Sequence, residues 1–297
     1  MIRGKLFLKK RIWLSLSILC IIFSAIFWVA GKCSAERGKD FFRNLTIQAD
    51  ATKFTQSQLQ SMLTEQETKD PTEKIFSLAG WTEQKNEIIT RHDGGGSTEA
   101  DVITVCGSSY CLLPYGKNLC YSDKEGCIIG RTLAQELFGD SSVRGQKLTW
   151  QGKTWIVRDV LDEPAHLVMV QAQQESDELL FDYINISLDK NDDRKLTGEN
   201  FILQNNLSAH ILRWDYLYEF SWLTEMIPGK WSDFDEWKQN FENHRKAVNL
   251  VKNAEKTSIQ STGTQYQKKG RWLIILGLLS IAGALFFLVF NRKLRRK

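Results

Sequence analysis

The sequence lacks the short motifs by which many hydrolases and nucleotide-binding proteins are recognised. Its 297 residues include only four histidines, which are scattered and form no H-E-x-x-H arrangement: His92, His166, His210 and His244. The chain has no G-x-S-x-G nucleophile elbow and no G-x-x-x-x-G-K-[ST] phosphate-binding loop. We therefore predict no catalytic site, no cofactor and no metal site, and no ATP hydrolysis by this chain itself.

Two long stretches lack charge altogether. Residues 12–30 (IWLSLSILCIIFSAIFWVA) and residues 272–290 (WLIILGLLSIAGALFFLVF) each run for 19 residues without a charged side chain. A helix of that length spans roughly 28 Å, which is close to the hydrocarbon thickness of a bilayer. A buried core helix of a soluble protein would normally carry a polar stripe, and these do not. We predict transmembrane helices at 12–30 and 272–290, with the lipid bilayer as a partner.

The two tails lack acidic residues, and this sets the predicted topology. Residues 1–11 carry five Lys or Arg residues, residues 291–297 carry another five, and neither tail contains Asp or Glu. The positive-inside rule places both tails in the cytoplasm and residues 31–271 outside it. The first stretch is longer than a usual signal-peptide core and has no convincing cleavage site, so we interpret it as an uncleaved anchor. The predicted location is the cell membrane.

The charge balance excludes a nucleic-acid-binding role. The whole chain carries +4 and the two tails contribute +10, which leaves 4 − 10 = −6 for residues 12–290. The basic balance of the whole chain is therefore a signal of topology. Residues 31–271 are long enough, and rich enough in large apolar side chains, for one substantial domain or two small ones.

Four of the six cysteines crowd into 22 residues: Cys106, Cys111, Cys120 and Cys127. In an oxidising compartment they could form two disulfides, with three possible pairings. Four thiolates could also hold zinc, but no C-x-x-C occurs and the spacings fit zinc ribbons and fingers poorly. We rank disulfides first, free thiols second and a metal site third.

Strand and helix signals alternate between the two spans. The polar stretch 37–67 reads as a helix leading away from the membrane, and Thr132–Phe138 as a short amphipathic helix that ends at Gly139. Gln151-Gly152 is a tight-turn signal between strands 146–150 and 153–161. Further strands are predicted at 87–90, 102–105, 127–129, 166–170 and 183–188. The extracytoplasmic domain is therefore predicted to be mixed α+β.

A heptad pattern marks the last part of this domain. Apolar and aromatic positions follow one another at steps of 3, 4, 3, 4 and 3: Phe234, Trp237, Phe241, His244, Val248 and Val251. This pattern predicts a helical stalk near residues 232–256. The stalk either packs against its own domain or passes motion between domain and membrane. Residues 254–270 are predicted to be a polar connector into the second span.

The order of residues in Gly126–Leu161 suggests a family. Ile129-Gly130 ends a strand, Leu137-Phe138-Gly139 ends a short helix, Gly145-x-x-Leu148 follows, and Trp155–Leu161 forms the last strand. This run resembles the periplasmic core domain of MacB-like permeases, the FtsX-like class of ABC transporters. Upstream, Tyr115-Gly116-Lys117 and Ser122-Asp123 resemble the approach to that strand in the same family.

The resemblance implies a mechanotransmission role and a bacterial source. In the family an ATPase drives the permease helices and the outside domain moves with them. A complete member carries four membrane helices, whereas two are predicted here. We therefore expect a non-enzymatic, two-helix subunit that partners an ABC ATPase or a full permease, as a homo- or heterodimer. The alternative is a bitopic sensor or surface-binding protein without ATPase coupling.

Overall fold

A computed structural model describes residues 2–69, 77–113, 117–163, 165–173, 179–188, 193–217, 226–227, 230 and 233–295. Tyr115, Gly116 and residue 232, which belong to the sequence predictions above, lie outside the described residues. The chain divides into a helical unit, Met1–Lys39 with Gly263–Lys297, and a central unit, Asp40–Thr262. A mixed α+β unit between two apolar helices is the fold class predicted from the sequence.

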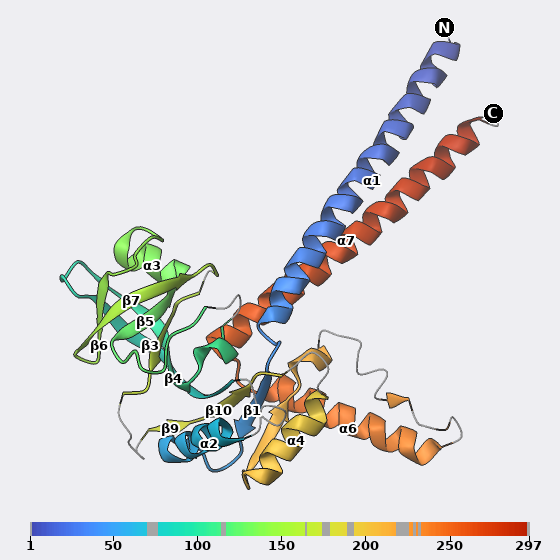
Figure 1. Ribbon diagram of the computed structural model, residues 1–297. Helices are drawn as coiled ribbons and strands as arrows, with labels where there is room; N and C mark the ends of the chain where they lie inside the picture. Colours follow the sequence, from blue (N-terminus) through green and yellow to red (C-terminus); the bar gives the residue numbers. More distant parts are fainter. Residues whose placement is uncertain are drawn as a thin grey trace. The chain divides into compact units, whose positions relative to one another are not determined.

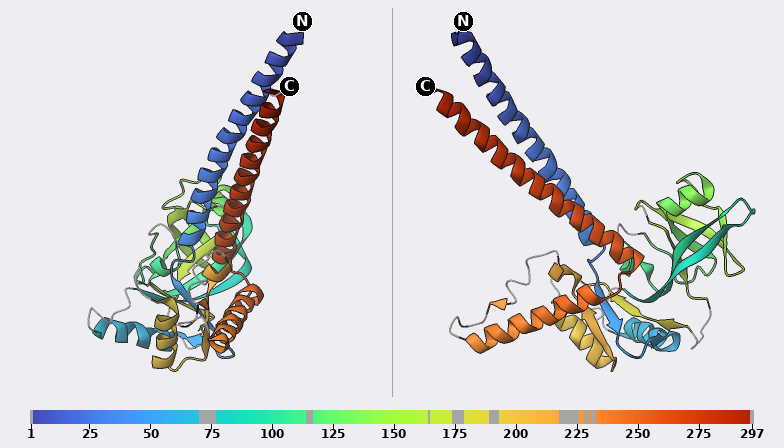
Figure 2. Two further views of the ribbon diagram at one scale, coloured as in Figure 1. Left: turned by 90° about the vertical axis from the view of Figure 1, so that its right-hand side faces the viewer. Right: turned by 180° about the vertical axis from the view of Figure 1, so that it is seen from behind.

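The helical unit consists of two long helices, α1 (Ile2–Asp40) and α7 (Ser258–Arg295), of which α7 makes its first turn in the central unit. They run side by side in every view (Figure 1; Figure 2). Both are long and apolar enough to cross a membrane, with mean hydropathies of 2.4 and 2.6 in their most apolar windows. The predicted polar connector at 254–270 is helical from Ser258 onward, as the first part of α7.

The central unit is built on a sheet of nine strands in the order β11-β1-β10-β3-β4-β8-β5-β7-β6. Their bounds are β1 Leu45–Ala49, β3 Leu78–Arg91, β4 Ser97–Gly107, β5 Gly126–Gly130, β6 Lys147–Trp150, β7 Lys153–Leu161, β8 Leu167–Gln171, β10 Tyr183–Ile186 and β11 Ala209–Leu212. Two short strands, β2 (Phe54–Thr55) and β9 (Leu180–Phe181), form a separate ribbon.

One end of this sheet closes into a small barrel. The last residues of β3, Thr90 and Arg91, pair with β6, so β3, β4, β8, β5, β7 and β6 form a ring. Helix α3 (Arg131–Phe138) buries Leu133 and Leu137 in the same apolar cluster as the barrel strands. Closure removes the unpaired edges that an open sheet would expose here.

Two local predictions about the barrel are confirmed. Helix α3 ends where Gly139 adopts a left-handed conformation, with φ 77°. The β6–β7 hairpin turns at Gln151 and Gly152, both with positive φ (49° and 74°), as a type I′ turn requires. The strands predicted at 87–90, 102–105 and 127–129 lie within β3, β4 and β5.

The other half of the sheet is open and carries most of the helices. Around β11, β1 and β10 lie α2 (Gln56–Thr68), α4 (Arg194–Gln204) and α6 (Phe234–Asn253) (Figure 1). The prediction of one helix over residues 37–67 is wrong. Helix α1 ends at Asp40, and Leu45–Ala49 forms a strand that pairs with both β10 and β11. In β1 the apolar residues alternate with polar ones, and this two-residue period is that of a β-strand.

Candidate functional site

The four cysteines predicted to form disulfides are free thiols in the structure. Cys106 on β4, Cys111 after β4 and Cys127 on β5 belong to three separate apolar clusters, and Cys120 is exposed. A disulfide needs Cβ atoms roughly 3.5–4.5 Å apart, and the strands carry these side chains into different parts of the core. The two predicted disulfides are therefore not formed.

The surroundings of the buried cysteines explain why they act as core side chains. Burial raises the pKa of Cys106 and of Cys111 to about 11, and that of Cys127 to about 12. These thiols are therefore protonated at neutral pH, whereas metal binding and thiol exchange need the thiolate. A buried Cys behaves as a small apolar side chain.

Small residues recur at every seventh position along both long helices. All eight are buried in the helical unit: Ser17, Ser24, Gly31 and Gly38 on α1, and Gly263, Gly270, Gly277 and Ala284 on α7. A seven-residue period keeps one helix face against its neighbour. Small side chains on that face let two membrane helices approach closely. We call these eight residues the small-residue seam.

Three glycines of the seam, Gly31, Gly38 and Gly270, leave no room for a side chain. A Cβ atom on Gly270 would lie 2.9 Å from both the Ala35 nitrogen and the Gly31 carbonyl oxygen. A Cβ atom on Gly31 would lie 3.0 Å from the Gly270 carbonyl oxygen. Outside the apolar span, Gln267 Nε2 donates a 2.9 Å hydrogen bond to the Ala35 carbonyl oxygen. The seam was not predicted, although its period can be read directly from the sequence.

The N-terminus of α7 is fixed by a capping box. The Thr257 hydroxyl accepts a hydrogen bond from the Gln260 backbone N–H at 3.4 Å, and the Gln260 side chain accepts one from the Thr257 N–H at 3.2 Å. This reciprocal pair satisfies two of the N–H groups that a helix leaves without partners at its start. Ile259, in the first turn of α7, is buried in the same apolar cluster as Val251 at the end of α6. Helix α7 therefore begins inside the core of the central unit.

The same turn of α7 is bonded to two strands of the sheet. Ser258 donates its backbone N–H to Glu83 Oε1 on β3 at 2.7 Å and its hydroxyl to Asp101 on β4. We call Ser258, Glu83 and Asp101 the α7 anchor. The positive end of a helix dipole favours carboxylates at this position. Burial raises the pKa of Glu83, and the nearby Asp101 adds to the rise, while the bonds from Ser258 oppose it.

The anchor lies at an irregular point of β3. A β-bulge between Gln84 and Glu87 interrupts the β3–β4 pairing, and Asn86 within it has a positive φ of 57°. The Asn86 backbone N–H donates to Asp101 Oδ1 at 3.1 Å. Before the bulge β3 pairs with β10, and after it β3 pairs with β6. The anchor therefore joins α7 to the junction of the open sheet and the barrel.

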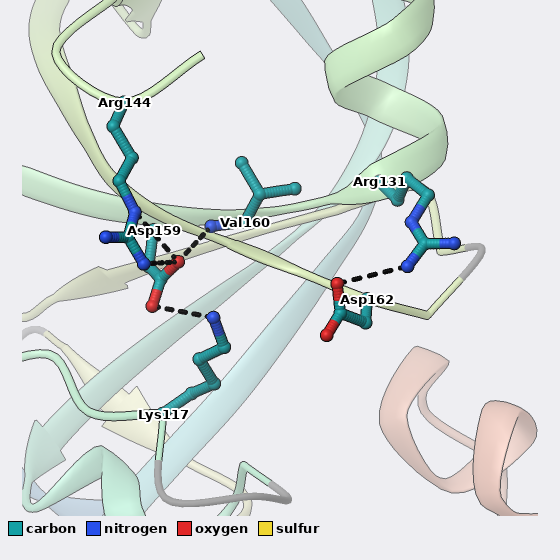
Figure 3. A network of polar contacts seen from close by, with 6 residues as sticks. All are labelled: Lys117, Arg131, Arg144, Asp159, Val160 and Asp162. Carbon is teal, nitrogen blue, oxygen red and sulfur yellow. Dashed lines mark hydrogen bonds and ion pairs between the residues drawn. The ribbon is translucent and has the colours of Figure 1, made fainter. Parts of the chain in front are cut away.

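A network of ion pairs surrounds Asp159 on the barrel (Figure 3). Asp159 accepts hydrogen bonds from Arg144 Nη2 at 2.7 Å, from Lys117 Nζ at 2.8 Å and from the Val160 N–H at 2.8 Å. Partial burial alone would raise the pKa of Asp159, but the bonds from Lys117 and Arg144 outweigh it and hold the pKa below its ordinary value. Asp159 is therefore a carboxylate at neutral pH and holds two chain segments together.

The pattern residues that suggested a family have structural roles. Arg158 occupies a bulge in β7, and its Nε lies 2.7 Å from Asp123 Oδ2. Lys117 likewise bonds to Asp159 beside that bulge. A Cβ atom on Gly130 would lie 2.0 Å from the Ala165 carbonyl oxygen, so only glycine fits there. These residues shape the barrel, and none of them forms a catalytic arrangement with its described neighbours.

Replacing Asp159 with asparagine is expected to lower the free energy of unfolding by about 1–2 kcal/mol at pH 7, because charge-assisted bonds to a partly buried group are lost. Asp162→Asn is the matched control and is expected to change it by less than about 0.5 kcal/mol, because the Asp162 side chain is 78% exposed in its pair with Arg131. Thermal unfolding of both variants of the full chain in lipid nanodiscs measures the difference.

The effect of Asp159→Asn should depend on pH. A carboxylate whose pKa is lowered by folding stabilises the fold fully above its ordinary pKa of 3.8, and this contribution is lost as the pH falls through the lowered value. The difference in the free energy of unfolding between the wild-type protein and Asp159→Asn should therefore be constant near neutral pH and should disappear only below about pH 4. A difference that disappears between pH 6 and pH 8 would contradict the conclusion that Asp159 is a carboxylate with a lowered pKa.

Comparison with known proteins gives two similar solved structures. No family model matches the sequence, and no curated protein matches it. The periplasmic region of MacB from Actinobacillus actinomycetemcomitans is 12% identical, with a TM-score of 0.46 over 64% of this chain and 95% of that chain. The extracellular domain of the noncanonic ABC-type transporter YknZ from Gram-positive bacteria is 13% identical, with a TM-score of 0.42 over 57% of this chain and 100% of that chain.

The first of these structures is the type of domain that the Gly126–Leu161 pattern resembles. With identities of 12% and 13% and TM-scores below 0.5, neither similarity assigns a role to this chain. The argument for function therefore rests on the residues of this chain.

Proposed function

We propose that the chain is a non-enzymatic membrane subunit of an ABC-type transport complex, in which the extracytoplasmic domain moves with the second membrane helix. The observation that carries the proposal is the continuity of α7 from its anchored first turn, through the apolar stretch 272–290, to Arg295. Helix α7 contains no proline, so no residue removes a backbone N–H from its hydrogen-bond ladder. A displacement of the helix in the membrane would act on β3 and β4 through the anchor.

The assignment to an ABC-type complex is supported by the pattern in Gly126–Leu161 and by the charge of the tails. With both tails in the cytoplasm, the ends of α1 and α7 face the compartment in which an ATPase works. The proposed partners are an ABC ATPase or a complete permease, and the complex is a homo- or heterodimer. A bitopic sensor would share the anchor and the two spans but would couple to no ATPase.

Affinity purification of the tagged full chain in mild detergent tests this proposal. We expect an ABC ATPase or a permease to co-purify, and the ATPase activity of that complex to respond to the chain. Recovery of a kinase as the partner, or of the chain alone, would overturn the proposal in favour of the sensor.

A helix-breaking substitution tests the coupling itself. Gln265 is exposed on α7 between the anchor and the apolar stretch. Proline at this position costs a helix about 3 kcal/mol and bends it. We expect Gln265→Pro to keep the partner but to lower the stimulated ATPase rate severalfold, and Gln265→Ala to leave that rate unchanged. An unchanged rate in Gln265→Pro would count against transmission through α7.

A further inference from the structure

A groove in the central unit lies between α4, β11 and α6. Its volume is about 600 Å³, which is within the range of about 300–1,000 Å³ that small-molecule sites occupy. Gly198 brings α4 close to the sheet, because its missing side chain would lie 2.6 Å from Ile211 Cδ1. Asp193 caps the start of α4 by accepting the Lys195 N–H at 2.9 Å. The groove is therefore bounded by regular secondary structure.

The wall of the groove is mainly apolar. Ile202, Leu203, Ile211, Met226 and Leu250 contribute large apolar side chains. Two small residues, Ala209 on β11 and Ala247 on α6, also line the groove. Leu203 is 75% exposed and Leu250 is 44% exposed, so apolar surface faces solvent on both helices. Covering such surface stabilises a complex by about 25 cal/mol for each Å² buried.

The fixed charges along the groove are mostly positive. Among the described residues that line it, Lys195, Arg213 and Lys246 are cations and Glu199 is the one carboxylate. Arg213 is only 7% exposed and already has an interaction within the protein, so the accessible cations are Lys195 and Lys246. Guanidinium and ammonium groups bind carboxylates and phosphates by charge-assisted hydrogen bonds. An apolar wall with a positive balance complements a ligand that is apolar along its length and negative at one end.

We propose that this groove binds a single-chain amphiphile with an anionic head. The chain would cover the apolar residues between α4 and α6, and the head would lie near the exposed ammonium groups of Lys195 and Lys246. A neutral or cationic amphiphile of the same length would gain the apolar contacts only. This inference goes beyond the proposed function and does not require coupling to an ATPase.

Photolabelling of the full chain in phosphatidylcholine nanodiscs tests the inference. The probes are dodecanoate with a photoreactive diazirine in its chain and the matching dodecylamine. We expect the carboxylate probe, well below saturation, to label peptides of α4 and α6 about tenfold more than the amine does, which corresponds to about 1.4 kcal/mol. Because peptides are identified individually, labelling of α1 and α7 from the bilayer is counted separately.

Three variants complete the test. Lys195→Glu with Lys246→Glu should lower labelling of the groove peptides by about tenfold. Ala247→Phe should lower it to a similar extent by filling the space without a change of charge. Lys252→Glu, on an exposed part of α6 away from the groove, should leave it unchanged. Equal labelling by both probes, labelling confined to α1 and α7, or labelling insensitive to the double charge reversal would overturn the inference.

Discussion

Replacing Trp155 with alanine is expected to destabilise the central unit by about 3–5 kcal/mol, the usual cost of removing a large aromatic side chain from a core. Trp155 on β7 is 2% exposed and belongs to the barrel cluster. Its ring lies 6.3 Å from that of Trp150, and the Lys153 ammonium lies 4.4 Å from its centre. Alanine would leave a cavity in a closed barrel, whose paired strands can collapse only a little.

The measurement is thermal unfolding of the full chain in nanodiscs, followed by near-ultraviolet circular dichroism. For a unit of this size, each 1 kcal/mol shifts the midpoint by about 2–4 °C, so a loss of about 10 °C is expected. Ile88→Ala is the control, because Ile88 lies on β3 of the same barrel and is 67% exposed. Its midpoint should move by less than about 2 °C. Equal shifts in both variants would contradict the placement of Trp155 in the core.

The second large effect is expected at Gly270 in the small-residue seam. Leucine at this position would push its Cβ atom to within 2.9 Å of backbone atoms of α1, which cannot move aside as a side chain could. The two helices should therefore separate along the seam. Ala282→Leu is the matched control, because Ala282 is exposed on the same helix.

A cross-link reports whether the helices remain paired. A Cβ atom on Gly283 would lie 3.9 Å from Cys20 Sγ, so Gly283→Cys in a Cys33→Ser background should form a disulfide when oxidised. We expect efficient cross-linking in that background and in its Ala282→Leu derivative, and about a tenfold lower yield with Gly270→Leu. A yield that Gly270→Leu does not change would show that the seam does not hold the helices together.

The sequence predicts those features of the fold that short-range signals determine. Gln151-Gly152 requires positive φ at two successive residues, and Gly139 ends α3 for the same reason, so both were placed correctly. The spans followed from the absence of charge over 19 residues. In each case the responsible residues are adjacent in the sequence, and no distant contact is needed to interpret them.

The features that the sequence did not predict depend on distant pairing. Closure of the barrel joins Thr90 to Thr149, and nothing local to either residue marks that contact. Leu45–Ala49 is too short and too polar in its surroundings to be recognised as a strand before its two neighbours are known. The cysteines were grouped by spacing, whereas the direction of each strand side chain decides which part of the core it enters.

The candidate sites show the same division. The α7 anchor combines β3, β4 and the start of α7, and the groove combines α4, β11 and α6, so neither is a sequence motif. The small-residue seam is different, because its seven-residue spacing can be read directly from the sequence of each helix. Its period is carried by small residues and not by large apolar ones, because membrane helices often pair through their smallest side chains.

The seven-residue period of the seam also restricts how α1 and α7 can slide along each other. Glycine faces glycine again only after one full repeat, which is about 10.5 Å of axial travel at about 1.5 Å per residue. At smaller offsets a side chain of α7 such as Ile274 would be driven into the α1 backbone at Gly31. Its Cγ1 is already only 2.8 Å from the position that a Cβ atom on Gly31 would take. Within one repeat the two helices therefore have a single axial register, and an axial displacement of one helix carries the other with it.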